Sequence, residues 1–370
     1  MAKPANNQQT RARARSGRVS SSVITLAHGG GGKAMRDLID DVFAGTFANP
    51  ALAPLEDQAR FMLTDLAGQG DRLAFTTDSY VVDPLFFPGG NIGELSVNGT
   101  VNDLAVCGAR PLYLSCAFVI EEGFAVAELR RIVESMQAAA SRAGVAIVTG
   151  DTKVVNRGAV DKLFITTSGI GVVPVGVDIA AVNARPGDKV LVNGYIGDHG
   201  AAILAARDDL ALDVPVQSDC QPLHGLVQAL LAACPEVHCL RDATRGGVAT
   251  VVNEFAQAAS VCVYLDEDRI PVRDVVRGVS EILGLDPMYF ANEGKLVALV
   301  PAAHAQTALE AMRAHPAGID AAIIGKLLFH QMDSTLYQAL LIRPFEFGMH
   351  RQVSRWATPF KGTQIGRAHV

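Results

Sequence analysis

The sequence predicts a two-domain α/β protein. Its 370 residues exceed the usual length of a single domain. In both halves, strand-like apolar runs alternate with segments whose apolar residues recur at helical spacing, which is typical of sheets covered by helices. A stretch from Pro174 to Asp188, rich in alanine and valine, separates the halves. We therefore expect one domain at residues 23–173 and a second at residues 174–326.

Hydrophobic periodicity gives the elements of the first half in order. A short apolar stretch at residues 23–27 runs into a glycine loop, after which a helix with one apolar face is expected to begin near Lys33. Strands are expected at residues 73–77, 112–120, 145–148 and 162–173, and helices at residues 92–107 and around residues 129–136.

The second half repeats the pattern of a loop followed by a helix. A strand is expected at residues 189–193, and helices are expected around residues 201–210, at residues 221–233 and from residue 248 onward. At the other end of the chain, residues 1–22 are polar and show no hydrophobic periodicity, so we expect a disordered tail there. No apolar segment follows this tail, which argues against a secretory signal.

Composition excludes several classes of protein. The 32 Lys and Arg residues against 38 Asp and Glu residues give a net charge of −6, whereas a nucleic-acid-binding face is normally basic. The longest strongly apolar run, residues 112–120, is too short to cross a bilayer, so no membrane association is expected. The six cysteines include no C-x-x-C pair, which indicates reduced thiols in a cytoplasmic protein. Cys234, His238 and Cys239 fit no common zinc spacing.

A loop of four glycines precedes the first helix. It comprises Gly29, Gly30, Gly31 and Gly32, followed by Lys33. It is not a Walker A loop, because that motif requires Gly and Ser or Thr where the chain has Ala27 and Ala34. The backbone N–H groups of such a loop can surround an anion at the positive end of a helix. A flexible surface connector explains the loop alone equally well.

Three carboxylates are candidates for a metal and phosphate site. Asp78 and Asp151 each follow a predicted strand, and Asp103 comes after Asn102 in a polar break of a predicted helix. Carboxylates at strand ends can converge on one crevice, where they suit Mg²⁺ bridged to phosphates. A turn or cap role explains each aspartate taken singly. Their presence together with Lys153 and the glycine loop favours a nucleotide site.

Seven segments of the chain form a distinctive set. They are LAHGGGGKAM, FTTDSYVVDPLFFPGGNIGELSVNGTVNDLAVCGA, YLSCAFVIEEG, IVTGDTKVV, GDHGA, LRDATRGGV and FANEGKL. Together they resemble the HypE family of hydrogenase maturation factors, in the superfamily of aminoimidazole ribonucleotide synthetase and selenophosphate synthetase. The resemblance extends from about Val23 to Lys326. The selenophosphate branch is disfavoured, because Leu26-Ala27-His28 supply no reactive cysteine beside the glycine loop.

The resemblance implies a fold and an activity. The fold is PurM-like, with an N-terminal mixed sheet and helices, a C-terminal α/β domain, and pairing of the N-terminal domains in a homodimer. In such proteins a HypF-like carbamoyltransferase loads a carbamoyl group onto a C-terminal cysteine, and ATP with Mg²⁺ phosphorylates the carbamoyl oxygen. Loss of phosphate leaves a thiocyanate, from which cyanide passes to iron on a HypC–HypD-like scaffold. The site must align the amide oxygen with the γ-phosphate and neutralise charge.

By analogy, the nucleotide and its metal are assigned to the first half. Asp78, Asp103 and Asp151 are assigned to Mg²⁺ and phosphate, and Asn102 to orienting the phosphates. Asp83 is a further acidic candidate. The phosphate contacts are assigned to the backbone of Gly29, Gly30, Gly31 and Gly32 and to Lys33, Thr152 and Lys153.

The second half supplies candidates for the region that receives the modified tail. They are Asp198, His199, Asp242, Thr244, Arg245, Asn292, Glu293 and Gly294. Glu293 is assigned to proton transfer, because removing water from a carbamoyl group needs a base for the nitrogen protons. His199 is the competing candidate, and Lys153 completes the catalytic set. A hydrogen-bonded turn explains His199 equally well, and a helix cap explains the loop at residues 245–247.

The sequence departs from the family at its C-terminal end. HypE-like chains end in Pro-Arg-Ile-Cys or a close variant, whose thiol carries the carbamoyl group, whereas this chain ends in QIGRAHV at residues 364–370. A common sequencing adapter can encode these residues, and the resemblance stops after Lys326. We therefore hypothesise a frameshift near residue 327 followed by adapter read-through, with a real divergent terminus as the alternative. Residues 327–370 are then expected to be disordered or poorly packed, and the chain to be inactive in cyanide synthesis.

Two other functions stay open at this point. One is another ATP-dependent enzyme of the superfamily, acting on a small amide or phosphate without a cysteine tail. The other is a non-catalytic scaffold that binds the other maturation proteins without ATP or the acidic residues.

Overall fold

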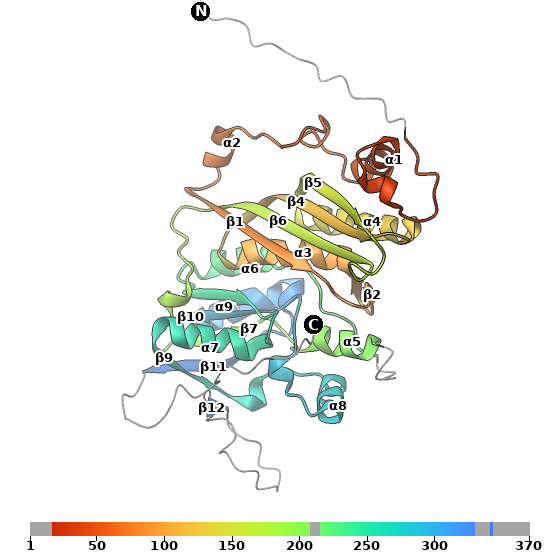
Figure 1. The fold of residues 1–370 in the computed structure, drawn as a ribbon. Helices are drawn as coiled ribbons and strands as arrows, with labels where there is room; N and C mark the ends of the chain where they lie inside the picture. The colour runs from red at the N-terminus through yellow and green to blue at the C-terminus, as the bar shows by residue number, and fades with distance from the viewer. Residues whose placement is uncertain (1–16, 208–214, 330–340, 343–370) are drawn as a thin grey trace, which may run out of the picture.

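Two sheets, one in each half of the chain, organise the protein (Figure 1). The computed structural model describes residues 17–207, 215–329 and 341–342. The N-terminal sheet has the order β1-β6-β4-β5. Its strands are β1 Arg72–Tyr80, β4 Arg110–Glu121, β5 Ala146–Val155 and β6 Leu163–Val173. Only the β4–β5 pair is parallel, so the sheet is mixed, which confirms the predicted class.

Two helices cover one face of this sheet, α3 Ile92–Val106 and α4 Val126–Ala143. The Asn91 side chain caps α3 by accepting hydrogen bonds from the N–H groups of Gly93 and Glu94. Almost every residue of α3 is buried, polar ones included, because the helix lies between the sheet and the second domain (Figure 1). The opposite face of the sheet carries exposed apolar side chains, Leu73 at 60% and Phe75 at 72% exposure.

Short elements flank the N-terminal sheet. The glycine loop follows the 3-10 turn η1 Leu26–Gly29 and leads into α1 Lys33–Leu38, which continues as the π-helical η2 Ile39–Ala44. The remaining elements are α2 Leu63–Ala67 and the hairpin strands β2 Phe86–Phe87 and β3 Gly90–Asn91.

The second sheet has the order β12-β9-β11-β7-β10-β8. Its strands are β7 Lys189–Val192, β8 Cys239–Asp242, β9 Val261–Leu265, β10 Leu296–Val300, β11 Ala322–Phe329 and β12 Leu341–Ile342. The main helices are α5 Asp198–Ala206, α6 His224–Ala233, α7 Gly247–Ala259, α8 Asp274–Leu283 and α9 Ala305–Ala314. Strand β10 is fully buried, because α6 and α9 pack on one of its faces and α7 packs on the other.

Three predicted boundaries need correction. The strand predicted at residues 73–77 continues to Tyr80, so Asp78 lies within β1 and pairs with Thr167 of β6. Likewise Asp151 lies within β5, paired with Ala117 of β4. In both cases cross-strand hydrogen bonding continues past the carboxylate, whose side chain is not fully buried. The predicted polar break in α3 is also absent, and the helix is continuous through residue 103.

The chain ends of the described part make specific contacts. The Val19 N–H donates to Asp41 Oδ2 at 2.8 Å, so contacts begin before residue 23. At the other end β11 extends to Phe329 and includes Leu327, which is 1% exposed. Most of the predicted N-terminal tail (residues 1–16) and of the C-terminal segment (330–340 and 343–370) lies outside the described residues. Within the described part, no helix is long and apolar enough to cross a membrane.

Candidate functional site

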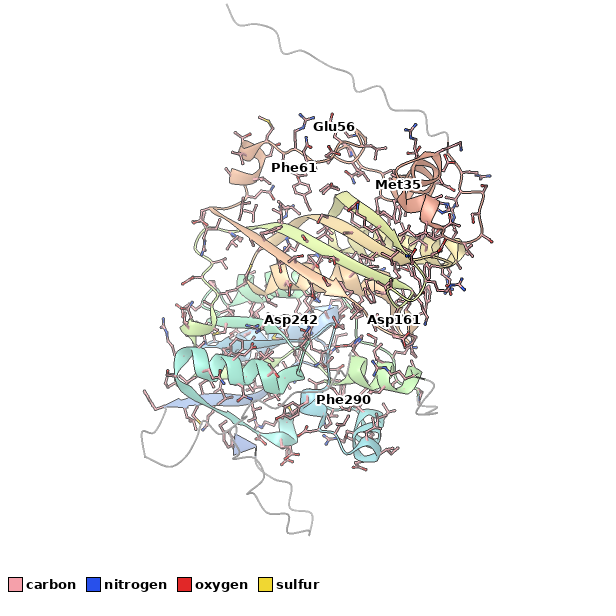
Figure 2. All side chains as sticks on the ribbon, viewed as in Figure 1. Met35, Glu56, Phe61, Asp161, Asp242 and Phe290 are labelled. Atoms are coloured by element: carbon pink, nitrogen blue, oxygen red, sulfur yellow. The ribbon has the colours of Figure 1, made fainter. Side chains whose placement is uncertain are left out.

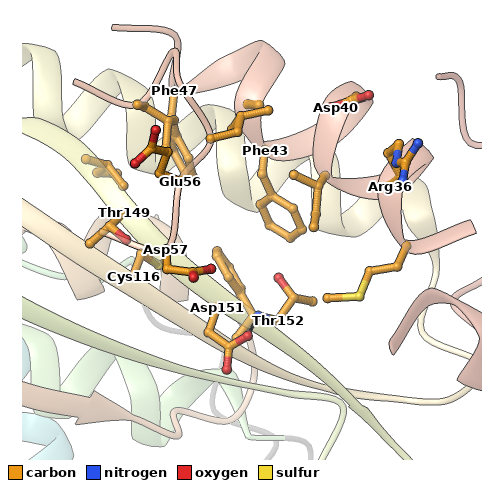
Figure 3. A pocket seen from close by; sticks show the side chains of 18 of the residues that line it. Arg36, Asp40, Phe43, Phe47, Glu56, Asp57, Cys116, Thr149, Asp151 and Thr152 are labelled. Carbon is orange, nitrogen blue, oxygen red and sulfur yellow. Dashed lines mark hydrogen bonds between the residues drawn. The ribbon is translucent and has the colours of Figure 1, made fainter. Parts of the chain in front are cut away.

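A cavity of about 750 Å³ lies at the β5 edge of the N-terminal sheet (Figure 3). Its walls are the glycine loop, the helical segment that follows, the loop after that segment, β5, and Cys116 and Phe118 of β4. Phe43 stands on the helical wall, while Asp151 and Thr152 stand on β5. The cavity therefore combines apolar surface with polar groups and the backbone of Gly31 and Gly32.

Glycine is required at two positions of this loop. A Cβ on Gly29 would lie 2.9 Å from the backbone nitrogen of Val154 in β5, so the loop could not lie this close to the strand with a larger residue. Gly31 has a φ of +79°, in the left-handed region. Lys33, which ends the loop, is 85% exposed and forms an ion pair with Asp37 at 2.5 Å, and it does not line the cavity.

The cavity takes in some of the predicted nucleotide-binding residues and not others. Gly31, Gly32, Asp151 and Thr152 line it together. Lys153 does not, although its Nζ lies 3.3 Å from Asp151 Oδ2. The predicted Asp83 forms an exposed ion pair with Lys162 at 3.2 Å.

The sheet register separates Asp151 from the other predicted metal ligands. Asp78 pairs with Thr167, whose side chain contacts α3, so Asp78 faces the helix side of the sheet. Asp151 pairs through Ala117 with Thr166, the neighbour of Thr167, and so faces the opposite side. Two strands, β6 and β4, stand between them. One chain therefore does not bring the three predicted carboxylates to one ion.

Asp78 and Asp103 instead belong to an acidic group where the two domains meet. Thr76 Oγ1 donates to Asp103 Oδ2 at 2.9 Å, and Arg245 Nη2 of the second domain donates to Asp78 Oδ1 at 3.3 Å. Asp242, at the end of β8, faces the same region (Figure 2). Burial and the nearby charges of Asp242 and Asp78 raise the pKa of Asp103 to about 6.

This arrangement does not fit a metal site built from Asp78, Asp103 and Asp151. Among the described residues, no three His, Cys, Asp or Glu side chains are grouped so as to hold an ion. The raised pKa values of Asp103 and Asp242 also favour their protonated forms, which are poorer metal ligands.

Glu293 is partly buried beside this acidic group. Burial raises its pKa well above the usual value, and the negative charges of Asp219, Asp242, Asp78 and Asp103 raise it further. Such a carboxyl group keeps its proton to a higher pH than an ordinary glutamate and is a stronger base once it has lost that proton. Its environment is compatible with proton transfer, and the role assigned to Glu293 from the sequence stays a prediction.

His199 has a different environment. Its Nδ1 lies 2.8 Å from Ser218 Oγ, and its ring meets the ring of Phe87 edge-on, with centroids 5.5 Å apart. Burial lowers the pKa of His199 to about 4, so the imidazole is neutral at pH 7. In the neighbouring residue Asp198, the carboxylate oxygen Oδ2 accepts a hydrogen bond from Arg273 Nε at 3.0 Å. His199 is thus a weaker base than Glu293.

Asn102 connects the two domains. It is 2% exposed, and its Oδ1 accepts from the Leu223 N–H at 2.7 Å. Its Nδ2 donates to the carbonyls of Gln221 at 3.1 Å and Glu293 at 3.4 Å. Both amide protons are used in this way. The predicted role of Asn102 was to orient the phosphates, but in the structure its side chain bonds to the main chain around Glu293.

The remaining candidates of the second half support the backbone near Glu293. Asn292 Oδ1 accepts from the Gly197 N–H at 2.7 Å, and Asn292 Nδ2 donates to the Ala243 carbonyl at 2.9 Å. Thr244 donates a side-chain hydrogen bond to Asp242 and lowers its pKa, although burial raises that pKa overall. Sequence reasoning missed Asp219, which lies in none of the quoted segments, and Lys295, which lies in FANEGKL two residues after Glu293.

Comparison with known proteins decides the family. The models for the N-terminal and C-terminal domains of AIR synthase related protein match residues 56–173 and 185–331. Over 303 residues, 82% of the chain, it is 58% identical to carbamoyl dehydratase HypE of Rhodobacter capsulatus and covers 88% of that protein. The chain belongs to the HypE family. Carbamoyl dehydratase HypE of Escherichia coli is 55% identical over 305 residues, 82% of the chain and 90% of that protein.

Solved HypE structures share the fold. The crystal structure of E. coli HypE matches with a TM-score of 0.80 at 50% identity, over 86% of this chain and 96% of that one. A HypE structure in complex with ATP matches with a TM-score of 0.79 at 48% identity, over 82% and 89%. A HypE–HypF complex matches with a TM-score of 0.68 at 48% identity, over 78% and 92%. The predicted PurM-like, two-domain fold and the family resemblance are therefore confirmed.

Proposed function

We propose that this chain is the ATP-dependent carbamoyl dehydratase of hydrogenase maturation. The observation that carries the proposal is the 58% identity to a HypE carbamoyl dehydratase over 303 residues. The substrate is a cysteine S-carboxamide, and the product is the corresponding thiocyanate, the source of cyanide for the iron of a [NiFe]-hydrogenase.

The reaction has two chemical steps. First the carboxamide oxygen attacks the γ-phosphorus of ATP, a P–O bond to ADP breaks, and the nitrogen loses a proton. The carbon–oxygen bond of the resulting phosphorylated imidate then breaks, phosphate leaves with the bonding electrons, and the nitrogen loses its second proton. The carbon and nitrogen remain on sulfur as a thiocyanate. The protein must therefore bind ATP, align the amide oxygen and accept protons.

ATP is assigned to the cavity at the β5 edge. Its apolar wall, which includes Phe43, suits an adenine ring, and the backbone N–H groups near Gly31 and Gly32 suit phosphates. The HypE structure in complex with ATP supports nucleotide binding by this family. Mg²⁺ would accompany the ATP phosphates and supply charge neutralisation, without a site made by Asp78, Asp103 and Asp151 together.

Glu293 is assigned as the proton acceptor for the carboxamide nitrogen. It lies beside Asp78 of β1, whereas the proposed ATP cavity is at the opposite, β5 edge of the sheet, so a single chain does not bring the two together. The partly buried Glu293 carboxyl group is surrounded by carboxylates, which makes its ionised form a strong base. Lys153 is assigned to the reacting phosphate as a cation with a 65% exposed side chain. His199 is the alternative base, disfavoured by its burial.

The exposed face of the N-terminal sheet supports a homodimer. Leu73 and Phe75 on β1 are mostly exposed, and Phe61 stacks on Tyr113 at 3.9 Å on the same face (Figure 2). Exposed apolar surface of this kind on a sheet is typical of an interaction face. Asp151 and Lys153 lie on this face, so pairing through it would place both residues near the second copy.

The partners follow from the same chemistry. A HypF-like carbamoyltransferase supplies the carboxamide, as the HypE–HypF complex supports. An iron-bearing scaffold complex of the HypC–HypD type receives the cyanide.

Thiocyanate formation tests the proposed function. This chain is compared with a variant in which residues 330–370 are replaced by a tail ending in Pro-Arg-Ile-Cys, with β11 kept because Leu327 is buried. Each receives carbamoyl phosphate, ATP and an active HypF-type partner, and the protein-bound product is identified by mass spectrometry. ATP-dependent thiocyanate is expected in the variant with the cysteine tail. Partner binding without any ATP-dependent thiocyanate in either chain would overturn the assignment and favour a scaffold.

A further inference from the structure

A buried ion pair lies next to Glu293, and the steps above do not use it. Lys295 Nζ donates to Asp219 Oδ2 at 2.9 Å, and the two side chains are only 8% and 4% exposed. Burying two charges is costly, and an apolar pair of similar size usually gives equal or greater stability. Stability alone therefore explains this pair poorly.

Asp219 uses its other oxygen on the main chain of Glu293. The Glu293 N–H donates to Asp219 Oδ1 at 3.0 Å, a charge-assisted hydrogen bond. Because Lys295 holds Oδ2, the Asp219 carboxylate is fixed at both oxygens. It thereby sets the position of the backbone from which the Glu293 side chain extends.

The segments that carry Asp219 and Glu293 also meet closely at Gly294. A Cβ on Gly294 would lie 1.9 Å from the Asp219 carbonyl oxygen, so glycine is required for this approach. The Glu293 carbonyl accepts from the Gln221 N–H and from Asn102 Nδ2, each at 3.4 Å. The main chain is thus held on both sides of the Glu293 side chain.

The charges around Glu293 come from several elements. Asp219 acts on it most strongly, followed by Asp242 of β8, Asp78 of β1 and Asp103 of α3. Positive charges also lie in this region. Lys295 forms an ion pair with Asp219, and Arg245 forms one with Asp78. Arg241 lowers the pKa values of Asp242 and Asp103 by its charge. Other titratable groups that interact electrostatically with members of this set are Tyr80, Cys107, Asp198, His199 and Cys220.

We propose that Asp219 is a positioning residue for the dehydration, which holds Glu293 by its main-chain N–H and places a fixed negative charge beside its carboxyl group. That charge makes the Glu293 carboxylate a stronger base and stabilises the protonated form produced when it takes a proton from nitrogen. The inference rests on the proposed role of Glu293 in proton transfer.

Three variants separate position from charge. Asp219→Asn keeps an acceptor for the Glu293 N–H and removes the charge, whereas Asp219→Ala removes both. The double variant Asp219→Asn/Lys295→Met avoids leaving an unpaired buried cation, so it guards against misfolding. Asp188→Asn is the matched control, because it breaks another buried contact of the same domain, between Asp188 Oδ2 and His238 Nδ1 at 2.8 Å.

The first measurement is an infrared titration of Glu293, whose carboxyl band is identified by its loss in Glu293→Gln. The midpoint is expected to move to lower pH in Asp219→Asn, and to move in the same direction but less in the double variant. Asp188→Asn is expected to leave it unchanged. An unchanged midpoint in Asp219→Asn would overturn the proposed charge effect, and this readout does not depend on catalysis.

The second measurement is the pH profile of thiocyanate formation, in chains carrying the cysteine tail. The acid limb of kcat is expected to move to lower pH in Asp219→Asn, and kcat is expected to fall roughly 10-fold or more in Asp219→Ala with the KM for ATP unchanged. An equal fall in kcat in Asp188→Asn would show that Asp219 has only a structural role. If the infrared midpoint moves but no chain makes thiocyanate, the proposed function fails while the effect of Asp219 on Glu293 stands.

Discussion

At the scale of single residues, burial controls the ionisation of the acidic group between the domains. The carboxyl groups of Asp103, Asp242 and Glu293 all have raised pKa values, and in each case burial is the largest cause. Each also senses the charges of its neighbours, so protonating one makes the others easier to ionise. The group therefore keeps its protons to a higher pH than exposed carboxyl groups do, and its members titrate as a set.

Asp103→Asn is expected to stabilise the fold at neutral pH. The folded-state pKa of Asp103 is about 6, above its unfolded value of about 3.9, so the folded state binds the proton more tightly. Asp103 therefore lowers stability as the pH rises from about 4 to about 6. Asparagine still accepts from Thr76 and cannot ionise, so the variant is expected to gain about 2 kcal/mol at pH 7.5 and little at pH 4.

Denaturant unfolding of the full chain at both pH values checks this expectation. Asp161→Asn is the control, because it changes an exposed carboxylate and should have little effect at either pH. A gain for Asp103→Asn of the same size at both pH values would contradict the argument, since it could not come from ionisation.

The sequence predicted individual site residues unevenly. The glycine loop precedes a helix as expected, and Gly31 and Gly32 line the cavity, whereas the roles of this loop and of Glu293 stay predictions. Asp151 was expected beside Asp78, but the side on which a strand residue points depends on register, which one extra residue reverses. Asp219 had no local signal, and Lys295 was not selected although it lies in FANEGKL, because its pairing with Asp219 exists only in the folded chain.

At the scale of elements, hydrophobic periodicity indicated where many helices and strands lie, but it placed their first and last residues poorly. It found the strands of the N-terminal sheet, β7 of the second sheet and the amphipathic α4, whose apolar residues form one buried face, but it did not find β8, β9 or the buried β10. It ended β1 three residues early, because Asp78 and Ser79 are poor strand formers in isolation and pair with β6 in the sheet. It also predicted a break in α3 at Asn102 and Asp103. The hydrogen bond between Asn102 and the second domain, which allows this polar residue to be buried in the helix, cannot be inferred from the local sequence.

The glycine loop yields a prediction about ATP binding. Gly31 and Gly158 have nearly equal φ angles, +79° and +81°, and neither has an atom within 4 Å of an added Cβ. Alanine at either position is therefore disfavoured by the backbone alone, by about 1–2 kcal/mol. Gly31→Ala is expected to weaken ATP binding roughly 5- to 30-fold, because the loop must adopt the positive φ angle in the bound state and alanine makes that conformation costly.

Gly158→Ala is the matched control for this measurement. It lies in the loop between β5 and β6 and not in the lining of the cavity. Calorimetric titration with ATP should give the same affinity for this variant as for the unaltered chain. Equal weakening by both substitutions would place the nucleotide elsewhere.

At the scale of the whole molecule, the proposed dimer depends on the exposed face of the N-terminal sheet. Phe75→Asp, at a side chain with 72% exposure, is expected to convert the dimer to a monomer by placing a charge within the apolar contact. The thermal stability of the single chain should change little. Sedimentation equilibrium measures the mass of the particle over a range of concentrations.

Ile282→Asp provides the comparison, because Ile282 on α8 is similarly exposed at 68% and belongs to the other domain. It should leave the dimer intact. Dissociation by Ile282→Asp and not by Phe75→Asp would move the interface to the second domain.

The interdomain hydrogen bonds of Asn102 restrict how the molecule can move. One amide side chain on α3 bonds to Gln221, Leu223 and Glu293, so a hinge between the domains would break all three bonds at once. Such a motion would also displace the backbone of Glu293, the proposed base. These bonds therefore oppose a hinge motion at Glu293, and under the proposed function the reacting group is expected to reach Glu293 on a flexible peptide.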